Sequence, residues 1–198
     1  MRGYRRAVAF IVVLNACVLY PASLRDILLR LAEVEMYDVK WSQRILDEAV
    51  DNLVDDARMS RDQAAYLMDC MNEAFEDALA PSDAVDLLEP SMTNDEKDRH
   101  VLAAAVVAGA QHIITSNLGD FPADATQPHA VEPVHPDDFL LAMLDLDVAL
   151  VRWVLERQAA DLVNPPMTRD ELLEVLAGTV PNFVARMREV LDQSAGSD

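Results

Sequence analysis

The chain has 198 residues, of which 52% are hydrophobic, so it is long and apolar enough to bury a sizeable core. Its 35 acidic and 16 basic residues give a formal net charge of −19, which argues against a passive protein that coats DNA or RNA. An enzyme that holds phosphate through a bound cation is not excluded, because clustered carboxylates bind divalent cations. Two cysteines are too few for a disulfide framework and favour a reducing cytoplasm.

The first apolar segment has two interpretations. Arg2, Arg5 and Arg6 precede the run 7–14 and small residues follow it, as in a secretory signal peptide. The run is also rich in β-branched residues, which is typical of a strand buried in a parallel sheet. Asn15 interrupts it and makes it too short to span a bilayer, so no membrane association is expected. We favour a strand over residues 8–14, because strands and helices alternate after it.

Helical spacing of apolar residues continues up to residue 109. The expected helices are 24–32 with Ser23 as its N-cap, one from Ser42 to about 54, one from about 60 to 79 that Pro81 ends, and 98–109 that Gly109 ends. The expected short strands are 84–88, 112–115 and 130–134. This alternation predicts an α/β fold, with a parallel sheet that helices cover on both faces.

The pattern changes after the last of these strands. Four helices are expected without a strand between them, at 137–145, 148–163, 168–176 and 181–191. We therefore predict two parts, an α/β domain at 1–134 and an all-α C-terminal extension at 135–198. Apolar stripes in the extension predict that it packs on the first domain.

Acidic and amide residues fall where a parallel sheet collects functional groups, at the carboxyl ends of its strands or on adjacent helices. They are Asn15, Glu48, Asp98 and Asp120, with Asp95 and Asn117 in supporting places. Together they would bind Mg²⁺ or Mn²⁺, and a metal-bound water would attack a phosphodiester. Taken singly, each of them is more simply a solvated surface group, since the chain has 35 acids.

Four motifs in order resemble the PIN-domain ribonucleases. They are V-L-N-A-C-V-L-Y-P at 13–21, W-S-x-x-I-L-D-E at 41–48, D-R-H-V-L-A-A-A at 98–105 and T-S-N-L-G-D-F-P at 115–122. The resemblance covers about residues 7–134 and is closest to VapC-like toxins of bacterial toxin–antitoxin pairs, one branch of which carries a C-terminal extension. It implies a Mg²⁺-dependent cytoplasmic endoribonuclease with an RNA substrate and an antitoxin partner, usually a homodimer. By this resemblance Asn15, Glu48, Asp98 and Asp120 are the catalytic and metal-binding positions, and Asn117 orients a water or a ligand.

One position departs from the family pattern. The first acid of the family is an aspartate, and this chain has Asn15. The side chains are nearly isosteric, but an amide oxygen is a poorer Mg²⁺ ligand than a carboxylate. Either an engineered substitution or a natural loss of activity explains it, and the intact Glu48, Asp98 and Asp120 favour the first. The alternative function is a catalytically inactive PIN-fold protein that binds antitoxin or RNA.

Other candidate residues have simpler interpretations. His100 and His112 lack metal-ligand spacing, and we expect both to serve packing; Cys17 is interpreted as a small buried residue. Arginine side chains are candidates for RNA-backbone contacts or are ordinary solvated groups, namely Arg5, Arg6, Arg25, Arg30 and Arg44. The apolar runs 67–75 and 140–144 are interpreted as core, with a subunit or antitoxin surface as the alternative.

Overall fold

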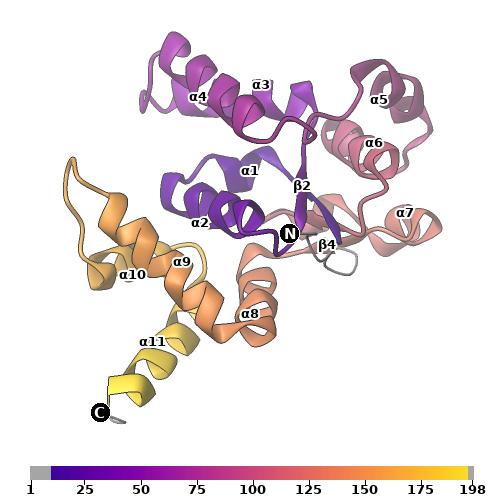
Figure 1. Cartoon of the computed structure of the whole chain (residues 1–198). Helices are drawn as coiled ribbons and strands as arrows, with labels where there is room; N and C mark the ends of the chain where they lie inside the picture. Colours follow the sequence, from indigo (N-terminus) through magenta and orange to yellow (C-terminus); the bar gives the residue numbers. More distant parts are fainter. Residues whose placement is uncertain (1–9, 196–198) are drawn as a thin grey trace, which may run out of the picture.

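A computed structural model describes residues 10–195 of the chain (Figure 1). Its centre is a four-stranded parallel sheet in the order β2-β1-β3-β4, formed by β1 (Ile11–Leu14), β2 (Asp38–Lys40), β3 (His112–Ile114) and β4 (Glu132–Val134). The first expected strand is confirmed from residue 11, and residues 8 and 9 lie outside the described residues. The strands expected at 112–115 and 130–134 are confirmed, whereas β2 was not predicted.

Helices surround this sheet and continue after it. In the first part they are α1 (Ala16–Leu19), α2 (Ala22–Glu33), α3 (Gln43–Asp55), α4 (Arg61–Ala74), α5 (Ser82–Leu88), α6 (Arg99–Ala108) and α7 (Ala123–Thr126). After β4 follow α8 (Pro136–Leu146), α9 (Val148–Asp161), α10 (Arg169–Ala177) and α11 (Pro181–Ala195). The predicted fold class, a parallel α/β domain with an all-α C-terminal part, is confirmed. Within residues 10–195, no helix has the length and apolarity that a membrane crossing requires.

The central strand forms the core because it is covered on every side. Val12, Val13 and Leu14 are fully buried, β1 pairs with β2 on one edge and β3 on the other, and α6 packs against it. Continuous burial explains why β1 is a run of apolar residues rather than an alternating pattern. The strand pairing sets Leu14 beside Ile114, so the next residue of each strand emerges at the same edge of the sheet.

Three sequence expectations are wrong. Residues 84–88, expected as a strand, belong to helix α5, which begins after Pro81. Val85 is the buried residue of this helix. The third helix ends at Ala74 rather than near 79, because Phe75 leaves the helical conformation and the chain then runs beside Trp41, whose backbone bonds Ala78 and Ala80. Helix α2 begins at Ala22 without a side-chain cap, so Ser23 is not its N-cap.

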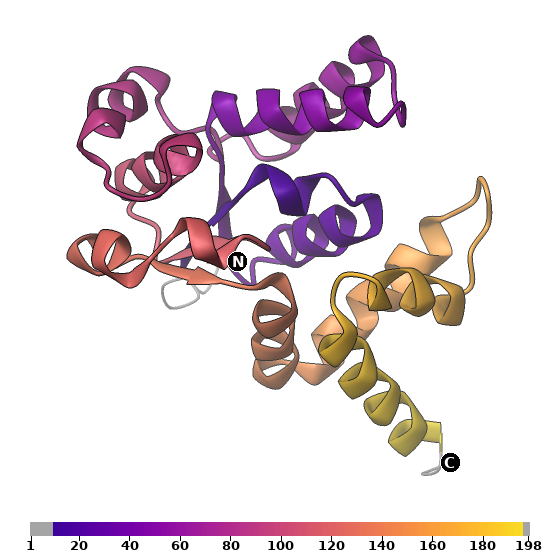
Figure 2. The ribbon, with the colours of Figure 1, turned by 180° about the vertical axis from the view of Figure 1, so that it is seen from behind.

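The C-terminal helices gather on the side of the molecule where α2 lies, away from α3 to α6 (Figures 1 and 2). α9 and α10 pack against α2, and the Gln158 Nε2 group donates to the carbonyl of Ser23 at 2.9 Å. The Phe139 ring meets the buried Tyr37 ring edge-on, with centroids 5.1 Å apart. In the run 140–144, Leu140, Met143 and Leu144 are buried, as the core interpretation expects.

Candidate active site

Asn15 occupies the carboxyl end of the central strand and is only 2% exposed. Its Oδ1 atom accepts a 2.6 Å hydrogen bond from the Ala16 N–H, which caps the short helix α1. The Nδ2 group donates at 3.2 Å both to Asp98 Oδ1 and to Thr115 Oγ1. The helix cap therefore fixes the amide so that its N–H donors, not its oxygen, face the neighbouring carboxylate.

Thr115 is a site residue that the sequence interpretation left without a role. It follows β3 directly, as Asn15 follows β1, and it is fully buried. Besides the Asn15 bond, its Oγ1 accepts from the Asn117 N–H at 3.1 Å, and Cys17 Sγ lies 3.4 Å away. Thr115 thus ties the two strand ends to the turn after β3. A polar residue immediately after a buried strand was the available signal.

Asp98 is the last residue of the short helical turn at 96–98 and immediately precedes α6. Its side chain is half-buried beside Asn15. Burial raises the pKa of its carboxyl group, the Asn15 hydrogen bond lowers it, and the negative charges of Asp120 and Glu48 raise it further. Three of the predicted acids are therefore close enough to interact electrostatically. Their mutual repulsion is the environment in which a carboxylate cluster gains most from a positive charge.

Glu48 reaches the site from α3 and contacts a histidine that we expected only to pack. The Nε2 atom of His100, on α6, lies 2.9 Å from Glu48 Oε1. His100 is fully buried, whereas the Glu48 side chain is 38% exposed. Packing alone is thus an incomplete account of His100. Spacing along the sequence did not reveal this contact, because it joins two helices.

The three remaining predicted residues lie around these groups. The backbone carbonyl of Asp120 accepts from the Asp95 N–H at 3.1 Å, and the Asp120 N–H donates to the Asn117 carbonyl. The Asp95 side chain caps the turn at 96–98 by accepting from the Lys97 N–H. Asp95 is therefore placed to shape the loop, while Asn117 lines the cavity described next.

A cavity of about 340 Å³ opens beside these side chains. It is lined by Asn15, Ala16, Cys17, Glu48, Asp51, Asn52, Lys97, Asp98 and Asn117. Four of the predicted residues share this cavity, and Asp120 stands outside its lining. The lining is mainly polar, and three carboxylates, those of Glu48, Asp51 and Asp98, outnumber the one basic side chain, that of Lys97.

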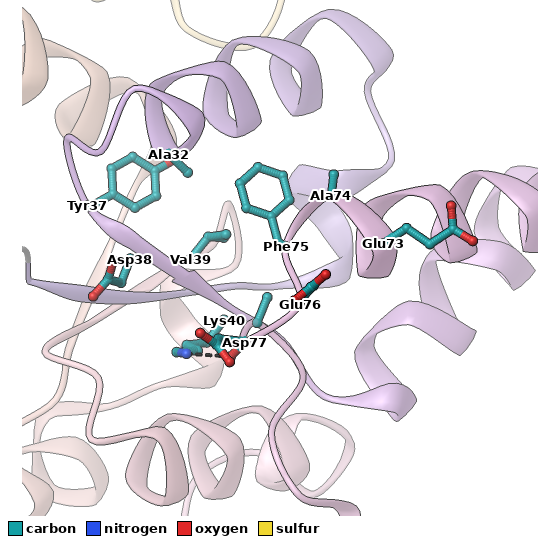
Figure 3. Close-up of a pocket in the computed structure, with 11 residues that line it drawn as sticks. Ala32, Tyr37, Asp38, Val39, Lys40, Glu73, Ala74, Phe75, Glu76 and Asp77 are labelled. Atoms are coloured by element: carbon teal, nitrogen blue, oxygen red, sulfur yellow. Dashed lines mark hydrogen bonds between the residues drawn. The ribbon is translucent and has the colours of Figure 1, made fainter.

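A larger cavity of about 450 Å³ lies beside the edge strand β2 (Figure 3). Its four acidic members, Asp38, Glu73, Glu76 and Asp77, are exposed, and Figure 3 shows Asp38 and Glu73 at its two ends. Lys40 donates to the backbone carbonyl of Asp77. This cavity does not gather its carboxylates at one point, so the smaller one is the better candidate for chemistry.

The side chains at the smaller cavity meet some of the needs of a divalent cation. Oxygen ligands are available from Glu48, Asp98 and Asp120, which is the chemistry that Mg²⁺ prefers. Among residues 10–195, however, no three histidine, cysteine, aspartate or glutamate side chains form a group that holds a metal ion. Asn15 stands at the centre and presents an N–H group to Asp98. The residues fit a divalent cation in type, and position 15 is the member that departs.

Most of the candidate RNA-binding arginines have other roles. Arg25 is buried and donates to the Leu19 carbonyl at 2.6 Å, so its assignment to RNA contact is wrong. Arg30 pairs with Asp26 and Asp161, and Arg44 pairs with Glu89. Arg5 and Arg6 lie outside the described residues. Within the described part of the chain, Lys97 is the basic side chain that lines the candidate cavity.

Residues 11–119 match the sequence profile of the PIN domain, which is more than half of the chain. The chain belongs to the PIN-domain family. Residues 136–189 match a second profile, the VapC50 C-terminal domain, so the predicted pairing of a VapC-like PIN domain with a helical extension is confirmed. No solved structure matches the chain.

A curated relative from Mycobacterium tuberculosis (strain ATCC 25618 / H37Rv) bears the name "Putative ribonuclease VapC50". The two proteins are 44% identical over 100 residues, which is 50% of this chain and 59% of the relative. The match thus spans little more than half of the relative's length.

Proposed function

We propose that this chain is a VapC-like PIN-domain endoribonuclease toxin of a toxin–antitoxin pair, whose Mg²⁺ site is disabled in this sequence by Asn15. The observation that carries the proposal is the Nδ2 group of Asn15, 3.2 Å from Asp98 Oδ1 at the centre of a cleft that also holds Glu48. An N–H donor there satisfies one carboxylate as a cation would, but it offers no oxygen to a metal. Family membership and the ribonuclease name of the relative support the activity class.

In the proposed active form, with aspartate at position 15, the acids of the cleft divide the work. Glu48, Asp98 and Asp120, together with that aspartate, would hold Mg²⁺ or Mn²⁺. The bound cation would supply an activated water and neutralise charge on the phosphodiester. Thr115 holds the side chain at position 15 against the end of β3, and Asn117 faces the same cavity to orient a ligand. Lys97 provides a positive charge for the incoming RNA phosphate.

The partners follow from the same proposal. RNA is the substrate, and the cognate antitoxin is a small protein that neutralises the toxin. We propose a homodimer in the cytoplasm as the working form. A chain with net charge −19 repels RNA at long range, so the substrate has to be drawn in locally by cleft charges and the cation.

The second candidate function is an inactive PIN-fold protein that binds antitoxin or RNA. It is favoured by the same Asn15 hydrogen bonds, because both the oxygen and the nitrogen of the amide have hydrogen-bond partners in the fold. In this function the cleft is retained as a binding surface without cleavage. The two candidates differ in what a single substitution at position 15 does.

The test is RNA cleavage by the chain and by its Asn15→Asp variant, with Mg²⁺, with Mn²⁺ and with chelator. We expect the variant to cleave only with metal and at least about a hundredfold faster, which is about 2.7 kcal/mol in the barrier. The double variant Asn15→Asp/Asp98→Asn is the control for a contaminating nuclease and should be inactive. If both proteins bind RNA and neither cleaves it, the result would instead support the second candidate.

A further inference from the structure

His100 is a fully buried imidazole that lies against the Glu48 carboxylate, with 2.9 Å between Nε2 and Oε1. Despite this short distance, within the described residues neither ring nitrogen has a hydrogen bond of good geometry. Burying such nitrogens lowers stability, and an apolar side chain would suit this place better if packing were the only requirement. A histidine at such a position calls for a reason outside packing.

We propose that His100 is a positioning residue that fixes the Glu48 carboxylate at the cleft. The inference rests on the proposed function, because the place of Glu48 matters most if that carboxylate helps to hold a cation. Glu48 projects from α3 with 38% of its side chain exposed, and without a partner it would sample several rotamers. The contact of Nε2 with Oε1 at 2.9 Å restrains one carboxylate oxygen and leaves Oε2 for the cleft.

The place of His100 in α6 makes this restraint part of the site. Asp98 immediately precedes α6 and His100 lies two residues later, while Glu48 comes from α3, which packs against α6. One short segment therefore provides one cleft carboxylate and holds a second one. His112 on β3 offers a comparison, because its Nδ1 lies 3.8 Å from the Oε2 atom of Glu132 on β4, and neither residue lines the candidate cavity.

The test uses the full chain carrying Asn15→Asp, to which His100→Met, His100→Gln or His112→Met is added. Mn²⁺ affinity is measured by calorimetry, and thermal stability is measured without metal. We expect His100→Met to melt at the same temperature or higher, yet to bind Mn²⁺ about 10- to 100-fold more weakly, the usual effect of removing a group that orients a ligand. Gln places an N–H donor at a similar depth, so His100→Gln should recover most of the affinity, and His112→Met should leave it unchanged.

The outcomes separate this inference from the function on which it rests. If Asn15→Asp binds Mn²⁺ and His100→Met binds it equally well, the positioning role is wrong and the proposed function stands. If Asn15→Asp binds no Mn²⁺ and cleaves no RNA, the proposed function fails and the role of His100 falls with it. The contact has its own readout in the unaltered chain. Glu48→Gln should shift the ring ¹⁵N resonances of His100 and leave those of His112 in place, and unchanged His100 resonances would overturn the inference.

Discussion

At the scale of single residues, the chemistry of the cleft depends on how one amide is turned. Asn15 could present either its oxygen or its nitrogen to Asp98, and the Ala16 N–H decides between them by taking the oxygen at 2.6 Å. The nitrogen then faces Asp98 and Thr115. An aspartate in the same rotamer would place a second negative oxygen about where Nδ2 now donates, so a hydrogen bond would become a repulsion.

We therefore predict that Asn15→Asp lowers the free energy of unfolding without metal, by about 1–2 kcal/mol at neutral pH. Added Mg²⁺ should restore stability in the variant and have little effect on the unaltered chain, because ligand binding stabilises the native state. Melting curves with and without Mg²⁺ measure both effects. Asn117→Asp, which adds a charge at an exposed position of the same cavity, is the matched control. Equal responses to Mg²⁺ in all three proteins would contradict the prediction.

The raised pKa of Asp98 gives a pH dependence with a definite sign. Burial first, and then Asp120 and Glu48, raise the pKa in the folded chain, so the native state holds this proton more tightly than the unfolded chain. The stability contribution of the protonated group is present below the unfolded pKa of 3.8 and is lost as pH rises through the folded value.

Asp98→Asn should consequently stabilise the chain more at neutral pH than at a pH of about 3.5, since the amide oxygen still accepts from Asn15. Urea unfolding across this range provides the measurement. Asp124→Asn, on the exposed first turn of α7, controls for the general loss of one negative charge. If Asp98→Asn changes the free energy of unfolding equally at both pH values, the pH dependence does not come from this carboxyl group.

At the scale of elements, side-chain N-caps and a C-terminal glycine mark where several helices begin and end. Ser42 and Ser60 cap α3 and α4 through their side chains, and Ser60 forms a capping box with Gln63, as the sequence pattern indicates. α2 has no side-chain cap, and its start was misplaced. α4 ends early because the chain must turn to run beside Trp41, and that turn serves a tertiary contact rather than a local preference.

Gly109 is the clearest of these signals, because it ends α6 with φ at +66° in the left-handed region. A Cβ there would meet no atom within 4 Å, so Gly109→Ala tests backbone strain alone. We expect it to lower the free energy of unfolding by about 1 kcal/mol. Gly119→Ala, which also meets no neighbour and needs no positive φ, should be close to neutral. Chemical denaturation of both variants compares them, and equal losses would disprove the strain argument.

At the scale of the whole molecule, the helical extension and the α/β domain share one core. α9 and α10 cover α2, and the Phe10, Tyr37 and Phe139 rings pack together where the two parts meet. The division at 134/135 stays a prediction, and its consequence is testable because this shared surface is mainly apolar.

We predict that a chain ending at Val134 aggregates and melts at a lower temperature, because it uncovers α2 and Tyr37. Size-exclusion chromatography and thermal melting provide the measurements. Arg30→Gln in the full chain is the control: it breaks the ion pair with Asp161 and leaves the apolar contact, so it should cost less than about 1 kcal/mol. A monodisperse 1–134 fragment with an unchanged melting temperature would show that the extension is independent.

The sequence by itself determined the elements whose signals are local. Gly109 and the β-branched run before Asn15 each act within a few residues, so periodicity and such local end signals sufficed to predict β1, α3, α6 and the four C-terminal helices. It also placed polar groups at the carboxyl ends of β1 and β3, since parallel strands end at one edge.

Only the tertiary structure decided which neighbours these groups meet. β2 is three residues long and is held by pairing with β1, and residues 84–88 are helical because no strand adjoins them in the described part of the chain. Likewise, the Asn15 amide is oriented by hydrogen bonds to residues 98 and 115, and the histidine contact joins residue 100 to residue 48. Sequence spacing carries no such information, because these contacts form only when the sheet brings distant strand ends and helices together.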